Sequence, residues 1–314
     1  LPFPHVVVLE HKATPTGSLL KLKNIYLESL KRMLQEPSAA LAGGITVGER
    51  RSLGEQLTED FRSTGLIHII VLSGYNIAII VMAISALLSF LPHKIRYTTA
   101  ILVIILFTIL VGASATVVRA AIMGSIGANG AMAGRTYSAL HALMFAGLAM
   151  LLWNPYTLIF DPSFQLSFIA TLGLLFGVPL LVPYLTWIPN KLGMRELTAA
   201  TIATQIAVYP LLLYMMGKVS LVSLPVNLLV LPIIPFAMLA VFLTGVFGSI
   251  NFIVALPFAY LAQGALIYVF KVVEIFASLS FSTAAVPVFS FWWIAIAYVL
   301  LGLGVWYGKM KVPD

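Results

Sequence analysis

Apolar runs joined by short polar connections fill the chain from Gly65 to Gly308, and this pattern restricts the possible folds more than any other feature. Only three acidic residues, Asp161, Glu196 and Glu274, occur in that stretch. Charged residues make up 9% of the whole chain, against about 25% in soluble globular domains. Because the runs have the length of transmembrane helices, about 20 residues, we predict an all-α, polytopic integral membrane protein. It has about 8–9 transmembrane segments, and some of its helices are broken.

The predicted segments contain interruptions. They lie near residues 66–91, 98–113, 117–134, 137–153, 162–187, 197–216, 220–247, 252–280 and 285–308. Alternatively, the second and third are half-helices that meet at residues 112–116. Pro225, Asn227, Pro232 and Pro235 predict a break in the seventh segment. Discontinuous helices often line transport routes, so this segment is a candidate wall of a passage.

Charge divides the chain into three parts. Residues 1–62 contain eight Lys/Arg and seven Asp/Glu and are predicted to be an N-terminal extramembrane region with amphipathic helices. Residues 63–308 form the predicted transmembrane domain, and residues 309–314 form a short basic tail. The basic amphipathic segment near residues 19–33 is typical of a helix in the membrane interface, and packing on a soluble partner domain is an equal alternative.

The formal net charge is +7, and basic residues are spread unevenly over the short loops. With nine crossings, one side of the membrane receives Lys94, Arg96, Arg135, Lys191, Arg195, Lys309 and Lys311. Among the short loops, only Lys218 falls on the other side. The positive-inside rule therefore places the first set in the cytoplasm and residues 1–62 outside.

Polar residues in the first segment mark a candidate passage. Ser73-Gly74 can interrupt the helix, and irregular backbone at membrane depth is tolerated only where protein or a wet cavity satisfies it. His68, Ser73 and Asn76 then supply polar groups on one short stretch. The alternative is a close helix contact at Gly74, with the Ser73 hydroxyl bonded to the preceding turn.

Arg119 is a fixed positive charge within an apolar run. Its guanidinium must reach the interface, form a pair or face water. A structural pair with Asp161 or with a helix C-terminus is one alternative, and a role in a passage is an equal one at this point.

Asp161 and Pro162 have the order of an N-cap and a first helical residue. Gln165 is four residues further on, where it can bond with Asp161.

Lys271 and Glu274 are three residues apart on one helical face and are predicted to neutralise each other. We therefore assign Asp161, Lys271 and Glu274 to structural bracing.

Signatures of enzymes are missing. The chain has no Gly-rich phosphate loop and no Gly-x-Ser-x-Gly nucleophile elbow. It has no cysteine, and its five histidines are scattered. The sequence therefore predicts a protein that is not an enzyme and holds no metal or other cofactor.

Ordered motifs give a more specific hypothesis. Gly48-Glu-Arg-Arg-Ser-Leu, Phe61-Arg-Ser-Thr-Gly-Leu-Ile-His68 and Leu72-Ser-Gly-Tyr-Asn76 are followed by Ser114–Met123 and by Asp161-Pro-Ser-Phe-Gln-Leu-Ser-Phe168. In this order they resemble the competence domain of ComEC-type DNA-uptake proteins, over about residues 20–308. One departure is Tyr75-Asn76, where family members often have Leu-His or a similar pair.

The resemblance implies a channel that passes single-stranded DNA across the bacterial cytoplasmic membrane during transformation. It also implies that Ser73, Gly74, Arg119, Asp161 and Gln165 match the family's recurrent polar positions. The candidate DNA path comprises His68, Ser73, Gly74, Asn76, Arg119 and Gln165. Implied partners are single-stranded DNA, membrane lipids, other competence proteins, separate OB-like and nuclease domains, and a second copy of the chain. The rival functions are a permease for a small or lipid-linked substrate and a membrane scaffold without transport.

Overall fold

The computed structural model describes residues 15–49, 53–70, 74, 76, 77, 79, 88–190, 193–287 and 289–311. The first predicted transmembrane segment, residues 66–91, lies largely outside the described residues. The described elements are α1 (Pro15–Met33), α2 (Ser38–Val47), α3 (Glu55–Ser63), α4 (Ile67–Ile70), α6 (His93–Val111), α7 (Ala115–Met132), α8 (Ala139–Trp153), α9 (Thr157–Phe160), α10 (Pro162–Leu181), η1 (Val182–Leu185), α11 (Met194–Met216), β1 (Lys218–Ser220), α12 (Ser223–Val230), α13 (Ile234–Gly248), α14 (Phe252–Ala277), β2 (Thr283–Ala285) and α15 (Phe291–Lys311).

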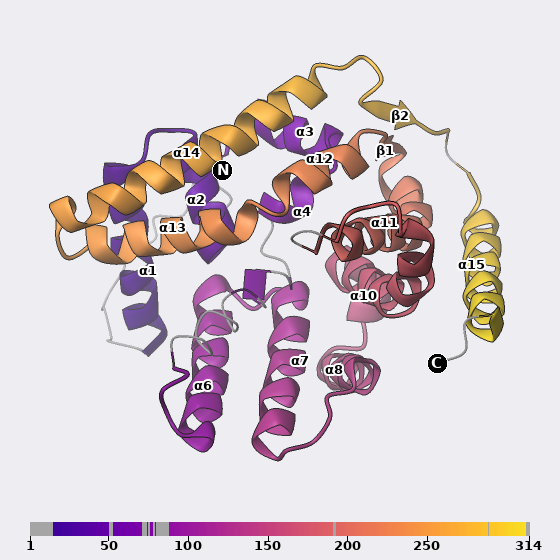
Figure 1. The fold of residues 1–314 in the computed structure, drawn as a ribbon, viewed down its shortest axis with the longest axis horizontal. Coiled ribbons are helices and arrows are strands. Elements are labelled where there is room, and N and C mark those ends of the chain that lie inside the picture. The colour runs from indigo at the N-terminus through magenta and orange to yellow at the C-terminus, as the bar shows by residue number, and fades with distance from the viewer. Residues whose placement is uncertain are drawn as a thin grey trace, which may run out of the picture.

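The predicted fold class is confirmed, because most of the described chain is helical (Figure 1) and several of its helices are long and apolar. Five described helices are long and apolar enough to cross a membrane: α6, α10 together with η1, α11, α14 and α15. A bent pair, α12 and α13, makes a sixth candidate. The helix α8 has 15 residues and is shorter than a full span of about 20. The count of eight or nine spans therefore stays a prediction.

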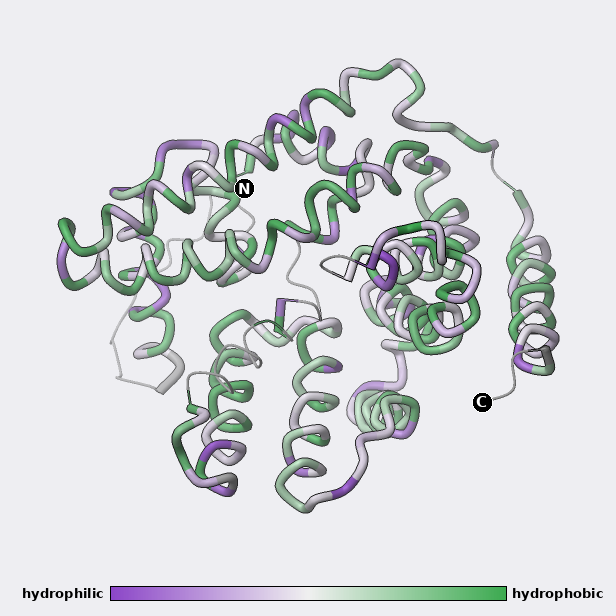
Figure 2. Tube along the Cα trace, viewed as in Figure 1, coloured by the Kyte–Doolittle hydropathy of each residue, from purple (hydrophilic) through white to green (hydrophobic). Residues whose placement is uncertain are grey.

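Consecutive helices pair as hairpins that run in different directions. Figure 1 shows α6 beside α7, while α13 and α14 run across the view and α10 and α11 are seen nearly end-on. Hydrophilic residues gather at the ends and connections, and the bodies of the helices are mostly hydrophobic (Figure 2). The candidate spans therefore do not share a single axis, unlike a simple series of parallel crossings.

The N-terminal helices share a hydrophobic core with the helices near the C-terminus. Leu30, Leu41 and Phe61 are fully buried together with residues of α12, α13 and α14. All ten residues of α2 are buried. The described parts of residues 1–62 thus pack against α12, α13 and α14 of the same chain. Leu20 and Leu22 of α1 remain exposed, so the interfacial position of the segment near residues 19–33 stays a prediction.

Two glycines allow α10 and α11 to approach closely. A Cβ atom built on Gly173 lies 2.6 Å from the Cβ atom of Ala207, and one on Gly177 lies 2.7 Å from that of Ala203. Small residues at helix contacts of this kind are typical of membrane proteins. The α10–α11 hairpin is therefore a tightly packed unit.

The seventh predicted segment is broken as the prolines indicated. The helices α12 and α13 meet at a bend of 49°. Pro232 and Pro235 have no N–H to donate, so the carbonyl groups four residues earlier lose their helical partners. Just before this break, β1 pairs with β2 in an antiparallel ribbon, with Val219 opposite Ala284. The ribbon ties the start of α12 to the connection before α15.

Candidate functional site

Asp161 is an N-cap, as the sequence predicted. Its Oδ1 atom accepts hydrogen bonds from the backbone N–H groups of Ser163 at 2.8 Å and Phe164 at 3.3 Å. Pro162 occupies the first helical position, where no N–H donor is needed. The carboxylate is therefore used to start α10.

Gln165 does not bond with Asp161, as the i to i+4 spacing had suggested. Its Nε2 atom donates to the carbonyl oxygens of Leu158 at 2.8 Å and Ile159 at 2.9 Å. These carbonyls belong to the short helix α9, which precedes α10 in the chain. Asp161 and Gln165 therefore fix the corner between α9 and α10 from its two sides.

Arg119 contacts α10, but at Thr171 and not at Asp161. Its Nη1 atom donates to the Thr171 hydroxyl and lies 3.6 Å from the sulfur of Met123. The Nε atom is buried and has no hydrogen-bond partner. Ion pairs within the described chain join only Arg32 to Glu28 and Arg62 to Glu59. The Arg119–Asp161 pair, one of the alternatives for Arg119, is therefore wrong, and no carboxylate of the described residues neutralises Arg119.

Gly74 lies against the guanidinium group. A Cβ atom built on Gly74 would be 2.5 Å from Nη2 of Arg119 and 3.6 Å from the Cβ atom of Ala120. A side chain at position 74 would therefore displace Arg119 or push the two segments apart. Gly74, from the motif Leu72–Asn76, thus lies against Arg119 and Ala120 of the motif Ser114–Met123.

Asn76 is buried and joins the same region to α2. Its Nδ2 atom donates to the carbonyl oxygen of Ile45 at 3.1 Å. The next residue, Ile77, packs against Val117 of α7. We name Gly74, Arg119 and Thr171 the guanidinium cluster. Segments far apart in the sequence meet in it.

The remaining predicted path residues lie elsewhere or cannot be placed. His68 is exposed, and its Nδ1 atom is 3.0 Å from the carbonyl oxygen of Gly65 in the preceding turn. Ser73 lies outside the described residues. Thr171 was not among the predicted site residues, and only its place on a polar ridge with Ser163 and Ser167 gave a signal.

Lys271 and Glu274 do not form the ion pair predicted for them. Both side chains are exposed on α14, and ion pairs within the described part of the chain occur only in α1 and α3. An exposed ion pair at this spacing contributes little to the stability. The two charged groups therefore lose little free energy when water solvates each of them separately.

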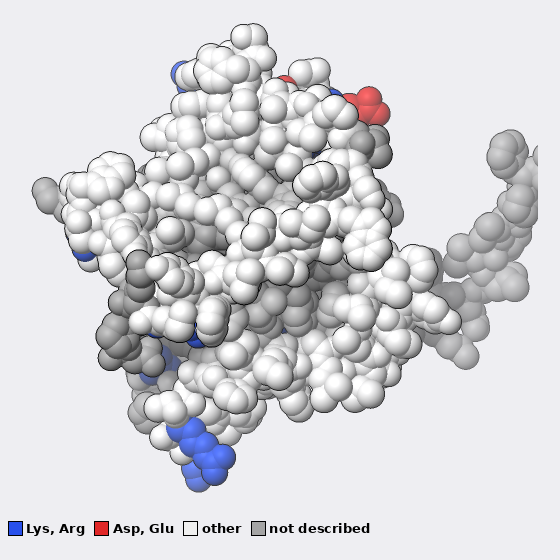
Figure 3. Space-filling view, turned by 90° about the vertical axis from the view of Figure 1, so that its right-hand side faces the viewer, with Lys and Arg blue, Asp and Glu red and all other residues white. Residues whose placement is uncertain are grey.

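Basic residues gather at the open end of the α6–α7 hairpin. Thr98 contacts Met132 at 4.0 Å, so Lys94 and Arg96 at the start of α6 lie at the same end as Arg135 after α7. Figure 3 shows a largely uncharged face on the α15 side, with basic groups at its lower end and along its left side and an acidic group near its upper edge. A largely uncharged surface with charge at its edges is the pattern expected of a protein embedded in a bilayer.

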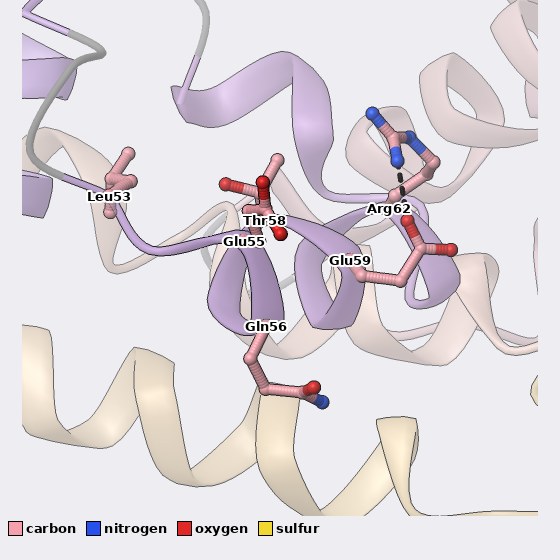
Figure 4. Close-up of a pocket in the computed structure, with 6 residues that line it drawn as sticks. All are labelled: Leu53, Glu55, Gln56, Thr58, Glu59 and Arg62. Carbon is pink, nitrogen blue, oxygen red and sulfur yellow. Dashed lines mark hydrogen bonds and ion pairs between the residues drawn. The ribbon is translucent and has the colours of Figure 1, made fainter.

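A surface hollow beside α3 does not suit an anionic ligand. It is lined by Leu53, Glu55, Gln56, Thr58, Glu59 and Arg62 (Figure 4). Its one cation, Arg62, is hydrogen bonded to Glu59, and Glu55 adds a second carboxylate. In the described residues, three or more His, Asp or Glu side chains never come together as a metal site would require. The guanidinium cluster therefore remains the strongest candidate site.

Fold and site together define a class: a polytopic helical membrane protein with a broken helix and, among its partly buried arginines, one that contacts a second helix and is neutralised by no described carboxylate. The chain belongs to the Competence protein family, whose model matches residues 45–311. This match confirms the resemblance carried by the sequence motifs.

Two relatives are similar to the chain over shorter stretches. ComE operon protein 3 of Bacillus subtilis (strain 168) is 25% identical over 230 residues, which cover 73% of this chain and 29% of that protein. An uncharacterized protein of Aquifex aeolicus (strain VF5) is 28% identical over 156 residues, which cover 49% of this chain and 37% of that protein. The chain thus spans well under half the length of each relative. No solved structure matches the chain.

Proposed function

We propose that the chain is the membrane core of a channel through which single-stranded DNA crosses the bacterial cytoplasmic membrane during natural transformation. Membership of the Competence protein family and the similarity to a protein of the ComE operon support a role in DNA uptake. The proposal assigns passage and no catalytic step to this chain. Its partners are the DNA strand, the surrounding lipids and other competence proteins.

The guanidinium cluster is the observation that carries the proposal. A DNA strand presents one phosphate charge per nucleotide, and arginine binds phosphate through a planar fork of N–H donors. Arg119 is held by a hydroxyl and a thioether, neither of which cancels its charge. Its Nε donor has no partner. The side chain is therefore positioned by the protein and keeps its charge for an anion.

Transformation frequency in a strain that lacks the protein, complemented with variants, tests the proposal. Deletion should abolish transformation. Because a hydrogen bond to a charged group contributes about 1.5–3 kcal/mol, Arg119→Ala should lower the frequency by roughly 10- to 100-fold at equal protein level. Arg119→Lys keeps the charge but loses the planar fork of N–H donors. Its transformation frequency should therefore lie between those of the native protein and Arg119→Ala. The matched control is Arg135→Ala, which removes an exposed cation outside the guanidinium cluster and should have little effect.

A charge placed beside Arg119 provides the opposite test. Thr171→Asp should form the ion pair that the native chain lacks, because position 171 already touches the guanidinium. The variant should fold and yet transform as poorly as Arg119→Ala, whereas Thr171→Ser should behave like the native protein. Normal transformation by the deletion strain would refute the proposed role of the chain in DNA uptake. Normal transformation by both single variants, Arg119→Ala and Thr171→Asp, would refute the proposed role of Arg119.

A further inference from the structure

A polar side chain halfway along α14 holds the turn between α1 and α2. Gln263 is about 16 Å along the helix from Phe252, at about 1.5 Å per residue. Its Oε1 atom accepts a hydrogen bond from the backbone N–H of Gln35 at 3.2 Å, and its Nε2 atom donates to the Ser38 hydroxyl at 3.0 Å. The α1–α2 corner, residues 35–38, is therefore fixed to the middle of an apolar helix long enough to cross a membrane.

This corner is charged and solvent-accessible. Glu36 is exposed, and its carboxylate accepts a hydrogen bond from the backbone N–H of Ala40 at 3.2 Å. None of the ion pairs found in the described chain includes Glu36. In the preceding turn of α1, the side chains of Arg32 and Glu28 are 74% and 67% exposed. A carboxylate and an ion pair of this kind are costly in lipid and stable in water.

The opposite flank of α14 is apolar at the same height. Leu261 is two residues before Gln263, so it points about 160° away around the helix, given 3.6 residues per turn. Its side chain is 66% exposed, and Val254 on the same flank is 50% exposed. Large apolar side chains exposed on a helix of this length are suited to lipid.

We infer that α14 is a wall between lipid and a water-filled vestibule, and that the vestibule reaches the middle of α14 along the α1–α2 corner. Lipid covers the Leu261 flank, and water reaches Glu36 on the Gln263 flank. The vestibule would be the entrance to the proposed DNA channel, and the identity of the passing molecule rests on that proposed function. A hydrated, charged strand needs a wet approach of this kind.

Thiol labelling tests the inference directly, because the chain has no cysteine and each introduced cysteine is the sole target. Glu36→Cys and Leu261→Cys are made in the full chain and reconstituted in lipid vesicles. A membrane-impermeant maleimide is supplied inside and outside the vesicles, and labelling after denaturation gives the total thiol. The thiolate is the reactive form, and a thiol ionises in water but not in lipid. We therefore expect Glu36→Cys, on the wet flank, to react at least about tenfold faster than Leu261→Cys, on the lipid flank. Arg32→Cys serves as a second vestibule position if Glu36→Cys folds poorly.

Each outcome decides the inference. Fast labelling at position 36 or 32 with protection at position 261 supports it. Equal labelling of both flanks places α14 outside the lipid and overturns it, and protection of both flanks overturns the wet vestibule. No DNA is used, so the vestibule can stand even if Arg119→Ala transforms normally. Conversely, loss of transformation in Arg119→Ala together with a protected Glu36→Cys keeps the channel and removes the vestibule.

Discussion

Moving one methyl group from α11 to α10, by Gly177→Ala and Ala203→Gly, tests the close packing of the α10–α11 hairpin. In Gly177→Ala, the new Cβ atom would lie 2.7 Å from the Cβ atom of Ala203 and 3.4 Å from its Cα atom. Carbon atoms in contact prefer about 3.5–4.0 Å, so the helices must separate locally by about 1 Å. Overpacking of this kind costs about 1–3 kcal/mol. Alanine recovers about 1 kcal/mol of that through its higher helix propensity, which leaves a net loss of about 1 kcal/mol.

The compensating change is on the facing helix. Ala203→Gly removes the atom that Gly177→Ala meets, so the double variant should form the same contact with the methyl group on the other side. Each single change should lower the stability, and the double variant should be more stable than the sum predicts by about 1–2 kcal/mol. Unfolding in mixed micelles with a rising fraction of denaturing detergent, followed by circular dichroism, gives the three free energies.

A glycine without neighbours supplies the control. A Cβ atom on Gly264, in the interior of α14, meets nothing within 4 Å. Gly264→Ala should therefore leave the stability unchanged or raise it by up to about 1 kcal/mol. If Gly177→Ala and Gly264→Ala have the same effect, and the coupling with Ala203→Gly is zero, the close approach of α10 and α11 is not as described.

Two further substitutions test the helix start and the shared core. Asp161→Ala should cost about 0.5–2 kcal/mol of unfolding free energy through the lost N-cap, and Asp161→Asn, which keeps an acceptor, should lose much less and transform normally; abolished transformation in a folded Asp161→Asn variant would contradict a purely structural role. Phe61 is fully buried and lies edge-on to Phe270 at 6.2 Å between ring centroids. Phe61→Ala should therefore cost about 3–5 kcal/mol, measured by the same micelle unfolding, and a loss below about 1 kcal/mol would contradict burial between α3 and α14.

Local signals in the sequence were reliable where the physics is local. An acid followed by proline predicts an N-cap because the carboxylate and the free N–H groups are within three residues of each other, and Asp161 has that role. Prolines in the seventh segment predicted a break for an equally local reason, the missing donors. The class of protein followed from run length and charge alone.

Partners far apart in the sequence could not be predicted from spacing. Gln165 was expected to bond with Asp161 one turn away, but the carbonyls of α9 compete for its donors once the α9–α10 corner folds back. The burial of α2 was also missed, because a helix of ten residues is too short for a span and its neighbours on α13 and α14 follow much later in the chain. The close contact of Gly74 with Arg119 could not be predicted, because the two residues are far apart in the sequence.

The separation of Asp161 from Arg119 decides which of the two charges is available to a ligand. Thr171 is ten residues beyond Asp161, which is about 15 Å along α10, so a carboxylate committed to capping the helix cannot reach the guanidinium. Had the two paired, both charges would be used in holding the structure, and the cluster would attract an anion only weakly. With a hydroxyl in that position, α10 fixes the direction of the arginine without reducing its charge. The same helix therefore begins with an acid that serves the fold and presents, three turns later, a neutral group that does not neutralise Arg119, as the proposed contact with DNA phosphate requires.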